Sequence, residues 1–144
     1  MHYAIGPYRP QDIEPVAAFD IDRRKVGRPL GEAIFAPPNN TLVFCPALSD
    51  AGPVVQMGPV ADGVAAHLLD YPEHRRFAPA DHPPVDVAAV LRETGAQILV
   101  NYLPVGAQKA TEYYAQAALD AGVALVNCIP VFIVSHPTWA QRFK

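Results

Sequence analysis

An apolar run ends on a carboxylate in Ala17-Ala18-Phe19-Asp20-Ile21-Asp22-Arg23-Arg24. A buried strand of a nucleotide-binding fold ends in this way, because an ionised carboxylate accepts hydrogen bonds from both hydroxyls of a ribose. The pattern predicts such a strand, with Asp20 at the ribose of a dinucleotide. The motif G-x-G-x-x-G, which lies about 20 residues upstream in these folds, does not occur in the sequence. We therefore expect the chain to be the middle of a larger protein.

Composition and charge narrow the class of protein. A chain of 144 residues with 51% hydrophobic residues can bury the core of one domain. The formal net charge of −3 and the scattered basic residues argue against a nucleic-acid partner. No run approaches the roughly 20 apolar residues of a membrane span, and the N-terminus lacks the pattern of a secretion signal. We expect a soluble, cytoplasmic protein without membrane contact.

The two cysteines give no sign of a metal site. Cys45 and Cys128 are far apart and have no histidine at ligand spacing, whereas a zinc site needs several such ligands. We predict no bound metal and two reduced thiols in the core.

Hydrophobic periodicity and turn residues predict the elements. In the first half we expect strands at 15–21, 41–45 and 54–57, short helical pieces within 23–35, a helical face at 60–69 and an exposed loop at 71–84. In the second half we expect helices at 85–94, 107–121 and 137–143 and strands at 97–103 and 123–127. A strand, a helix and a second strand in this order form a parallel crossover. The fold class is therefore α/β.

Ligands of open parallel sheets bind beyond the carboxyl ends of the strands. Three such ends lie at 20–22, 102–106 and 127–130, and they form one crevice if their strands are neighbours. Asp20 has a structural alternative as a helix N-cap, and Asn127 has one as the partner of a buried backbone group. Gly106 would let backbone N–H groups at a helix start face an anion. No catalytic dyad or triad emerges, so we assign no catalytic residue.

Four blocks of the chain, in order, resemble the inositol-3-phosphate synthases, specifically the shorter bacterial and archaeal branch. They are AAFDIDRRKVG at 17–27, AIFA at 33–36 with NNT at 39–41, NYLPVG at 101–106 and VNCIPVFI at 126–133. The resemblance implies an NAD-dependent cytoplasmic isomerase, usually a homotetramer. It would convert glucose 6-phosphate to 1D-myo-inositol 3-phosphate by oxidation, aldol cyclisation and reduction, with the hydride carried by NAD.

The resemblance also implies a set of cofactor-binding residues. Asp20 would bind the adenosine ribose and Ile21 would flank the adenine. The remaining residues would line the cofactor (Leu103, Pro104, Val105 and Gly106) or lie towards the nicotinamide (Asn127 and Pro130).

The chain departs from the family pattern at both ends. Family members carry the glycine-rich loop before the position of Met1, and a catalytic and oligomerising domain after that of Lys144. We therefore expect residues 1–144 to form an incomplete Rossmann-like NAD(P)-binding domain with a mainly parallel sheet, lacking the first strand and the glycine-rich loop. Lys25, Lys109 and Lys144 do not match the family's catalytic lysines.

The missing strand bears on folding and binding. It sits centrally in the strand order 3-2-1-4-5-6, so the sheet would have to close a gap or split, and NAD binding by the chain alone would be weak or absent. Two alternatives to a truncated synthase are a non-catalytic binding or assembly module and a generic NAD-dependent oxidoreductase domain.

Overall fold

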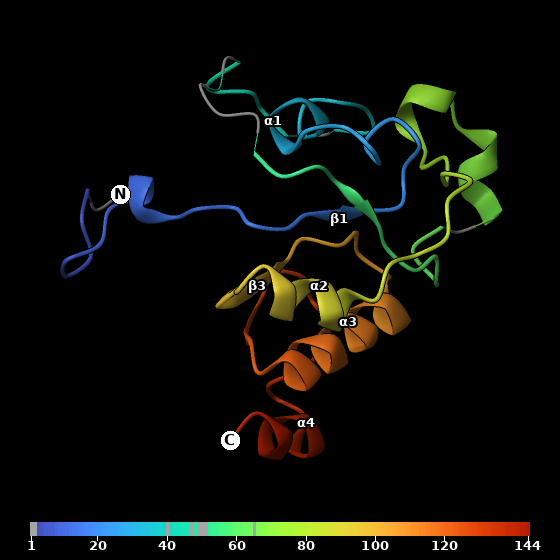
Figure 1. The fold of residues 1–144 in the computed structure, drawn as a ribbon. Coiled ribbons are helices and arrows are strands. Elements are labelled where there is room, and N and C mark those ends of the chain that lie inside the picture. The colour runs from blue at the N-terminus through green and yellow to red at the C-terminus, as the bar shows by residue number, and fades with distance from the viewer. Residues whose placement is uncertain (1–2, 40, 47, 49–51, 65) are drawn as a thin grey trace.

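The computed structural model describes residues 3–39, 41–46, 48, 52–64 and 66–144. Over these residues the structure is α/β, which confirms the predicted fold class (Figure 1). The elements, with η for a 3-10 helix, are η1 (Pro10–Asp12), β1 (Phe19–Asp20), α1 (Leu30–Ala33), β2 (Gln56–Met57), η2 (Ala66–Asp70), η3 (Glu73–Arg75), α2 (Val87–Glu93), β3 (Ile98–Asn101), α3 (Gln108–Ala121), β4 (Ala124–Asn127) and α4 (Pro137–Arg142).

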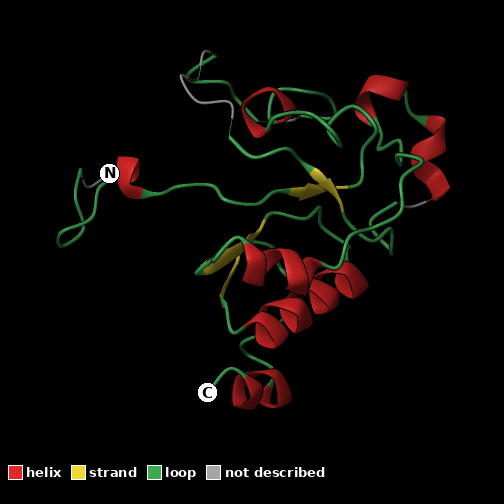
Figure 2. Ribbon diagram, viewed as in Figure 1, coloured by secondary structure: helices red, strands yellow, loops and turns green. Residues whose placement is uncertain are grey.

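The strands form two separate parallel pairs, β1 with β2 and β3 with β4 (Figure 2). In the second pair, Ile98 is opposite Ala124 and Asn101 is opposite Asn127. Because α3 connects β3 to β4, these three elements form the predicted parallel crossover. Among the described residues no ladder joins β1 to β3. The sheet is therefore split into these two pairs.

The three strands predicted in the first half are shorter than expected or absent. The strand at 15–21 is reduced to β1, where only two residues pair with β2, and the strand at 54–57 is reduced to β2. No strand forms over 41–45. Leu42 and Phe44 are 71% and 89% exposed, so their side chains are not buried in the core. A hydrophobic run without a neighbouring strand cannot satisfy its backbone by pairing.

The helix predicted at 60–69 is also wrong for its first part. Residues 60–64 are not helical, Ala65 lies outside the described residues, and a 3-10 helix, η2, follows. Gly63 disfavours a helix at this point. In addition, the carboxylate of Asp62 accepts hydrogen bonds from backbone N–H groups of α3.

The second half follows the predicted elements, with boundaries that differ by a few residues. The carboxylate of Asp86 accepts a hydrogen bond from the N–H of Ala89 at 3.0 Å and begins α2. Gly95 and Gly122 follow α2 and α3 with φ of 66° and 70°. Glycine adopts this left-handed conformation without strain, so both glycines end their helices as expected.

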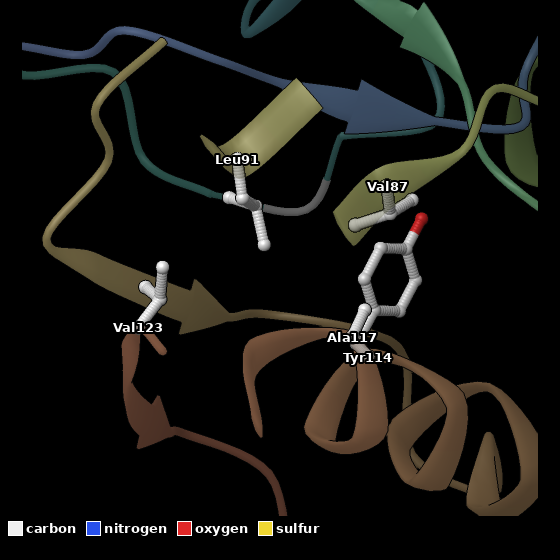
Figure 3. Packing of buried hydrophobic residues seen from close by; sticks show 5 residues of the cluster. All are labelled: Val87, Leu91, Tyr114, Ala117 and Val123. Carbon is white, nitrogen blue, oxygen red and sulfur yellow. The ribbon is translucent and has the colours of Figure 1, made fainter. Parts of the chain in front are cut away.

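The main core lies between α2 and α3 (Figure 3). Its buried residues are Val87, Leu91, Tyr114, Ala117 and Val123. Burial of each large side chain stabilises the fold by about 1.5–3 kcal/mol. Phe19 of β1 packs on this cluster, with its ring centroid 6.1 Å from that of Tyr114. This contact connects the first strand pair to the second half.

One face of the β3–β4 pair is open. Ile98, Val100 and Val126 are 58%, 45% and 46% exposed, and their register places them on the same face. The alternate residues Leu99 and Leu125 pack on the two core clusters instead. Parallel sheets are normally covered on both faces, so this apolar face is unusual.

Candidate functional site

Asp20 lies at the carboxyl end of β1, where the sequence predicts it. Its Oδ1 accepts hydrogen bonds from the N–H groups of Ile21 at 2.7 Å and Asp22 at 2.8 Å. Its Oδ2 lies 3.3 Å from Nζ of Lys25. A carboxylate has about four acceptor positions, and the Asp20 side chain is 26% exposed. Asp20 therefore closes the turn after β1 and still has acceptor capacity at Oδ2.

A small cavity of about 100 Å³ lies beside Asp20. Apart from Asp20 and Lys25, its lining is apolar and comes from β1, α1 and the segment before β2 (Ala18, Phe19, Leu30, Ala33, Ile34 and Val55). Charged groups therefore occupy only one part of the cavity wall.

A buried ion pair fixes the turn that follows Asp20. The Asp22 side chain is fully buried and accepts hydrogen bonds from Nε and a terminal nitrogen of Arg24 at 2.7 and 2.6 Å, and from the N–H of Ala78 at 2.8 Å. Burial raises the pKa of Asp22, but these hydrogen bonds outweigh it and hold the pKa below its usual range. Asp22 is therefore charged at neutral pH.

The same ion pair connects the loop at 71–84 to β1. The guanidinium of Arg24 also donates to the carbonyls of Glu73 at 2.7 Å and Arg76 at 2.6 Å. The N–H of Ala80 donates to the carbonyl of Ile21 at 2.8 Å. Residues 71–75 and 81–84 are exposed, as the sequence predicts, but the middle of the loop is bound to the candidate site.

The loop after β3 carries the next predicted residues. Asn101 is buried, and its side-chain oxygen accepts a hydrogen bond from the N–H of Leu103 at 3.0 Å. Leu103 packs on the core, Pro104 is half-buried, and Val105 is 80% exposed. Gly106 has a φ of 97°, which lets the chain turn into α3.

Asn127 makes its hydrogen bonds within the protein. Its amide nitrogen donates to the carbonyls of Ile129 at 3.1 Å and Val131 at 2.7 Å, and its oxygen accepts from Asn101 at 2.9 Å. The structural alternative for Asn127 is therefore present in the structure. These bonds fix the turn that presents the exposed Pro130.

The start of α3 is occupied by a carboxylate that the sequence did not reveal. Asp62 accepts hydrogen bonds from the N–H groups of Lys109 at 2.7 Å and Ala110 at 3.2 Å. The bond from Lys109 lowers the pKa of Asp62. The N–H groups expected to face an external anion after Gly106 thus bind the protein's own anion. Because 47 residues separate Asp62 from Lys109, no local motif signals this cap.

Two of the predicted residues, Asp20 and Asn127, line different cavities. A Cβ atom on Gly63 would lie 3.5 Å from Cβ of Ala107 and 3.6 Å from Cγ of Pro104, so the segment after β2 packs on the loop after β3. Asn127, by contrast, lines a second cavity of about 200 Å³ that also involves Phe143. Because β1 and β3 are not neighbours in one sheet, the condition for a single crevice is not met among the described strands.

The sequence prediction for the two cysteines is not met. Both cysteines are exposed, so their prediction as core thiols is wrong: Cys45 lies in an irregular segment and Cys128 in the turn after β4. Among the residues that the structure describes, no three His, Cys, Asp or Glu side chains gather in a way that could hold a metal ion. The described helices include none that is long and apolar enough to span a membrane.

The chain is similar along its whole length to inositol-3-phosphate synthases. It is 48% identical to the enzyme so named from Mycolicibacterium smegmatis over 100% of this chain and 38% of that protein. It is 47% identical to the one from Mycobacterium tuberculosis H37Rv over 99% of this chain and 37% of that protein. A relative of the same name from Corynebacterium glutamicum is 43% identical. The resemblance inferred from the four sequence blocks is confirmed.

The structure comparison agrees over the same range. The crystal structure of a protein described as Ari2 superposes with a TM-score of 0.75 at 33% identity, over 99% of this chain and 39% of that one. No protein-family profile matches the chain. The chain spans only about 38% of the length of the first curated relative.

Proposed function

We propose that this chain, which matches inositol-3-phosphate synthases from end to end, supplies the NAD-binding part of such an enzyme. The observation that carries the proposal is the 43–48% identity to proteins of that name over the whole chain. The carboxylate at the end of β1 agrees with it, since Oδ2 of Asp20 can accept a hydrogen bond beside a cavity. An acceptor in this place fits the ribose of a dinucleotide.

The residues after the strands of the two pairs then bind different parts of the cofactor. Asp20 binds the adenosine ribose, and Ile21 flanks the adenine. Leu103, Pro104, Val105 and Gly106 line the cofactor after β3. Asn127 fixes the turn that carries Pro130 towards the nicotinamide, through its bonds to two carbonyls. NAD, when bound, supplies the hydride acceptor and donor for oxidation and reduction.

A fifth parallel strand between β1 and β3 completes the sheet in this proposal. It joins the two observed pairs, in the order that dinucleotide-binding folds use, and brings a glycine-rich loop to the cofactor phosphates. The 144-residue chain alone then binds NAD weakly or not at all. We propose glucose 6-phosphate as the substrate of the whole enzyme and a homo-oligomer as its working form, and we assign no catalytic residue within this chain.

Two observations favour a second candidate, a binding or assembly module. Another polypeptide can cover the exposed apolar face formed by Ile98, Val100 and Val126. It can also pair with the strand edges that the split in the sheet leaves free among the described strands. In this case the chain associates with a partner through these surfaces and has no need of NAD.

A segment exchange separates the two candidates. The matching segment of the Mycolicibacterium smegmatis enzyme, about 38% of its length, is replaced by this chain. The proposal predicts that the folded chimera converts glucose 6-phosphate to inositol phosphate and needs NAD. A folded chimera that forms no product, beside an active parent enzyme, would favour the module.

A further inference from the structure

A lysine contacts the carboxylate proposed to bind the ribose. Nζ of Lys25 lies 3.3 Å from Oδ2 of Asp20, and the Lys25 side chain is only 16% exposed. Both side chains line the same cavity. The ribose oxygen that would bind Asp20 therefore approaches an ammonium group as well as a carboxylate.

The turn that carries Lys25 is held in place on several sides. The N–H groups of Lys25 and Val26 both donate to the carbonyl of Asp22 at 2.9 Å, and the N–H of Gly27 donates to Val55 at 2.8 Å. Asp22 itself is buried in its pair with Arg24. Lys25 thus points at Asp20 from a fixed backbone.

The two arginines before Lys25 bind groups other than the Asp20 carboxylate. Arg24 binds Asp22 and the carbonyls of Glu73 and Arg76. Arg23 pairs with the Glu73 side chain at the exposed surface. Of the three basic residues after β1, Lys25 is therefore the one that contacts Asp20.

Asp20 and Lys25 favour different cofactors. A carboxylate accepts from a ribose 2′-hydroxyl and repels a 2′-phosphate, whereas a nearby cation binds a 2′-phosphate. We propose that Lys25 sets the cofactor selectivity of this site: paired with Asp20 it permits NAD, and released from Asp20 it binds the 2′-phosphate of NADP. This inference rests on the proposed function, because it assumes that Asp20 meets the adenosine ribose.

Replacement of Asp20 by asparagine tests the effect of its negative charge alone. An asparagine oxygen can accept the same hydrogen bonds from the N–H groups of Ile21 and Asp22, so the turn is kept. The negative charge that engages Lys25 is removed. The free ammonium then faces the ribose position without a partner.

The test compares NAD⁺ and NADP⁺ binding by calorimetry in the full-length segment-exchange chimera. We expect the unaltered chimera to favour NAD⁺, and Asp20→Asn to shift the affinity ratio towards NADP⁺ by about tenfold or more, the effect of one hydrogen bond to a charged group. Adding Lys25→Met should abolish that shift, whereas adding Lys25→Arg should keep it. Lys144→Met, which removes a lysine at the far end of the chain (Figure 1), is the matched control.

Each outcome has one meaning. If Asp20→Asn shifts the ratio and Lys25→Met leaves that shift intact, Lys25 is not the selector, while the ribose role of Asp20 stands. If Asp20→Asn does not shift the ratio although the chimera binds NAD⁺, the inference is wrong and the cofactor assignment survives. If the folded chimera binds neither dinucleotide, the proposed function fails, and this inference fails with it.

Discussion

The hydroxyl of Tyr114 on α3 lies directly against Gly58, the residue that follows β2. A Cβ atom at position 58 would overlap the hydroxyl oxygen, whereas it would lie 3.5 Å from the ring carbon Cζ. Gly58 also donates its N–H to the carbonyl of Asp20 at 3.0 Å. The core of the second half thus reaches the backbone that supports the candidate ribose site.

Gly58→Ala should therefore lower the free energy of unfolding by about 1–3 kcal/mol, the usual cost of overpacking. In a Tyr114→Phe background the same substitution should cost much less, since the new methyl group would meet the ring and the carbonyl of Asp20 at ordinary contact distances. A double-mutant cycle by urea denaturation measures this coupling. An equal cost of Gly58→Ala in both backgrounds would show that the hydroxyl does not fill this space.

Tyr114 should also make stability depend on alkaline pH. Burial raises the pKa of Tyr114 above its usual range, so the folded state keeps the phenol protonated longer than the unfolded state does. The stability that the protonated phenol contributes to the folded state is complete below the unfolded pKa of about 10. This stability is lost progressively as the pH rises above that value. Unfolding free energies measured from about pH 8 to about pH 11 should fall more steeply for the native chain than for Tyr114→Phe. Parallel curves would rule this out.

Asp62→Ala should loosen the start of α3. Without the carboxylate, the N–H groups of Lys109 and Ala110 lose their partner, so their hydrogen exchange should accelerate and the melting temperature should drop. Asp70→Ala, at the exposed end of η2, is the matched control and should change neither. Because the pKa of Asp62 is lowered, the difference from the native chain should be present above its ordinary value of 3.8 and vanish as the pH falls through the folded value. Unchanged exchange at both amides would contradict the cap.

Asp22→Ala should be the most damaging change near the candidate site. It leaves Arg24 without its carboxylate and the N–H of Ala78 without an acceptor. Losing hydrogen bonds to a buried charge should cost about 2 kcal/mol or more. Asp22→Asn, which keeps an acceptor for Ala78, should cost less. Urea midpoints that rank the two variants in the opposite order would contradict this description of the turn.

The second half could be predicted from sequence because its signals are local. Gly95 and Gly122 end their helices, and the apolar spacing within α2 and α3 marks the faces that pack together. The strand at 41–45 failed because an apolar run shows that burial is possible, not that a partner strand is present. The long-range contacts of Asp62 with α3 and of Tyr114 with Gly58 carry no signal in a single sequence.

The candidate site was predictable to a similar degree. The strand end at Asp20 was found because an acid after an apolar run is a local pattern. The engagement of its carboxylate by Lys25 depends on the turn at 22–27, which the buried Asp22 and Arg24 pair holds. The placement of Asp20 and Asn127 in different cavities could not be predicted, because pairing between strands distant in sequence has no local signal.

The most direct test of the ribose role of Asp20 is NAD⁺ binding to the segment-exchange chimera, measured by calorimetry with Asp20→Ala and with the exposed control variant Asp70→Ala. We expect saturable binding that Asp20→Ala weakens by about tenfold or more, because a charged acceptor is lost, and that Asp70→Ala leaves unchanged. Equal NAD⁺ affinity in the native and Asp20→Ala chimeras, both folded, would contradict the assignment of Asp20 to the cofactor ribose.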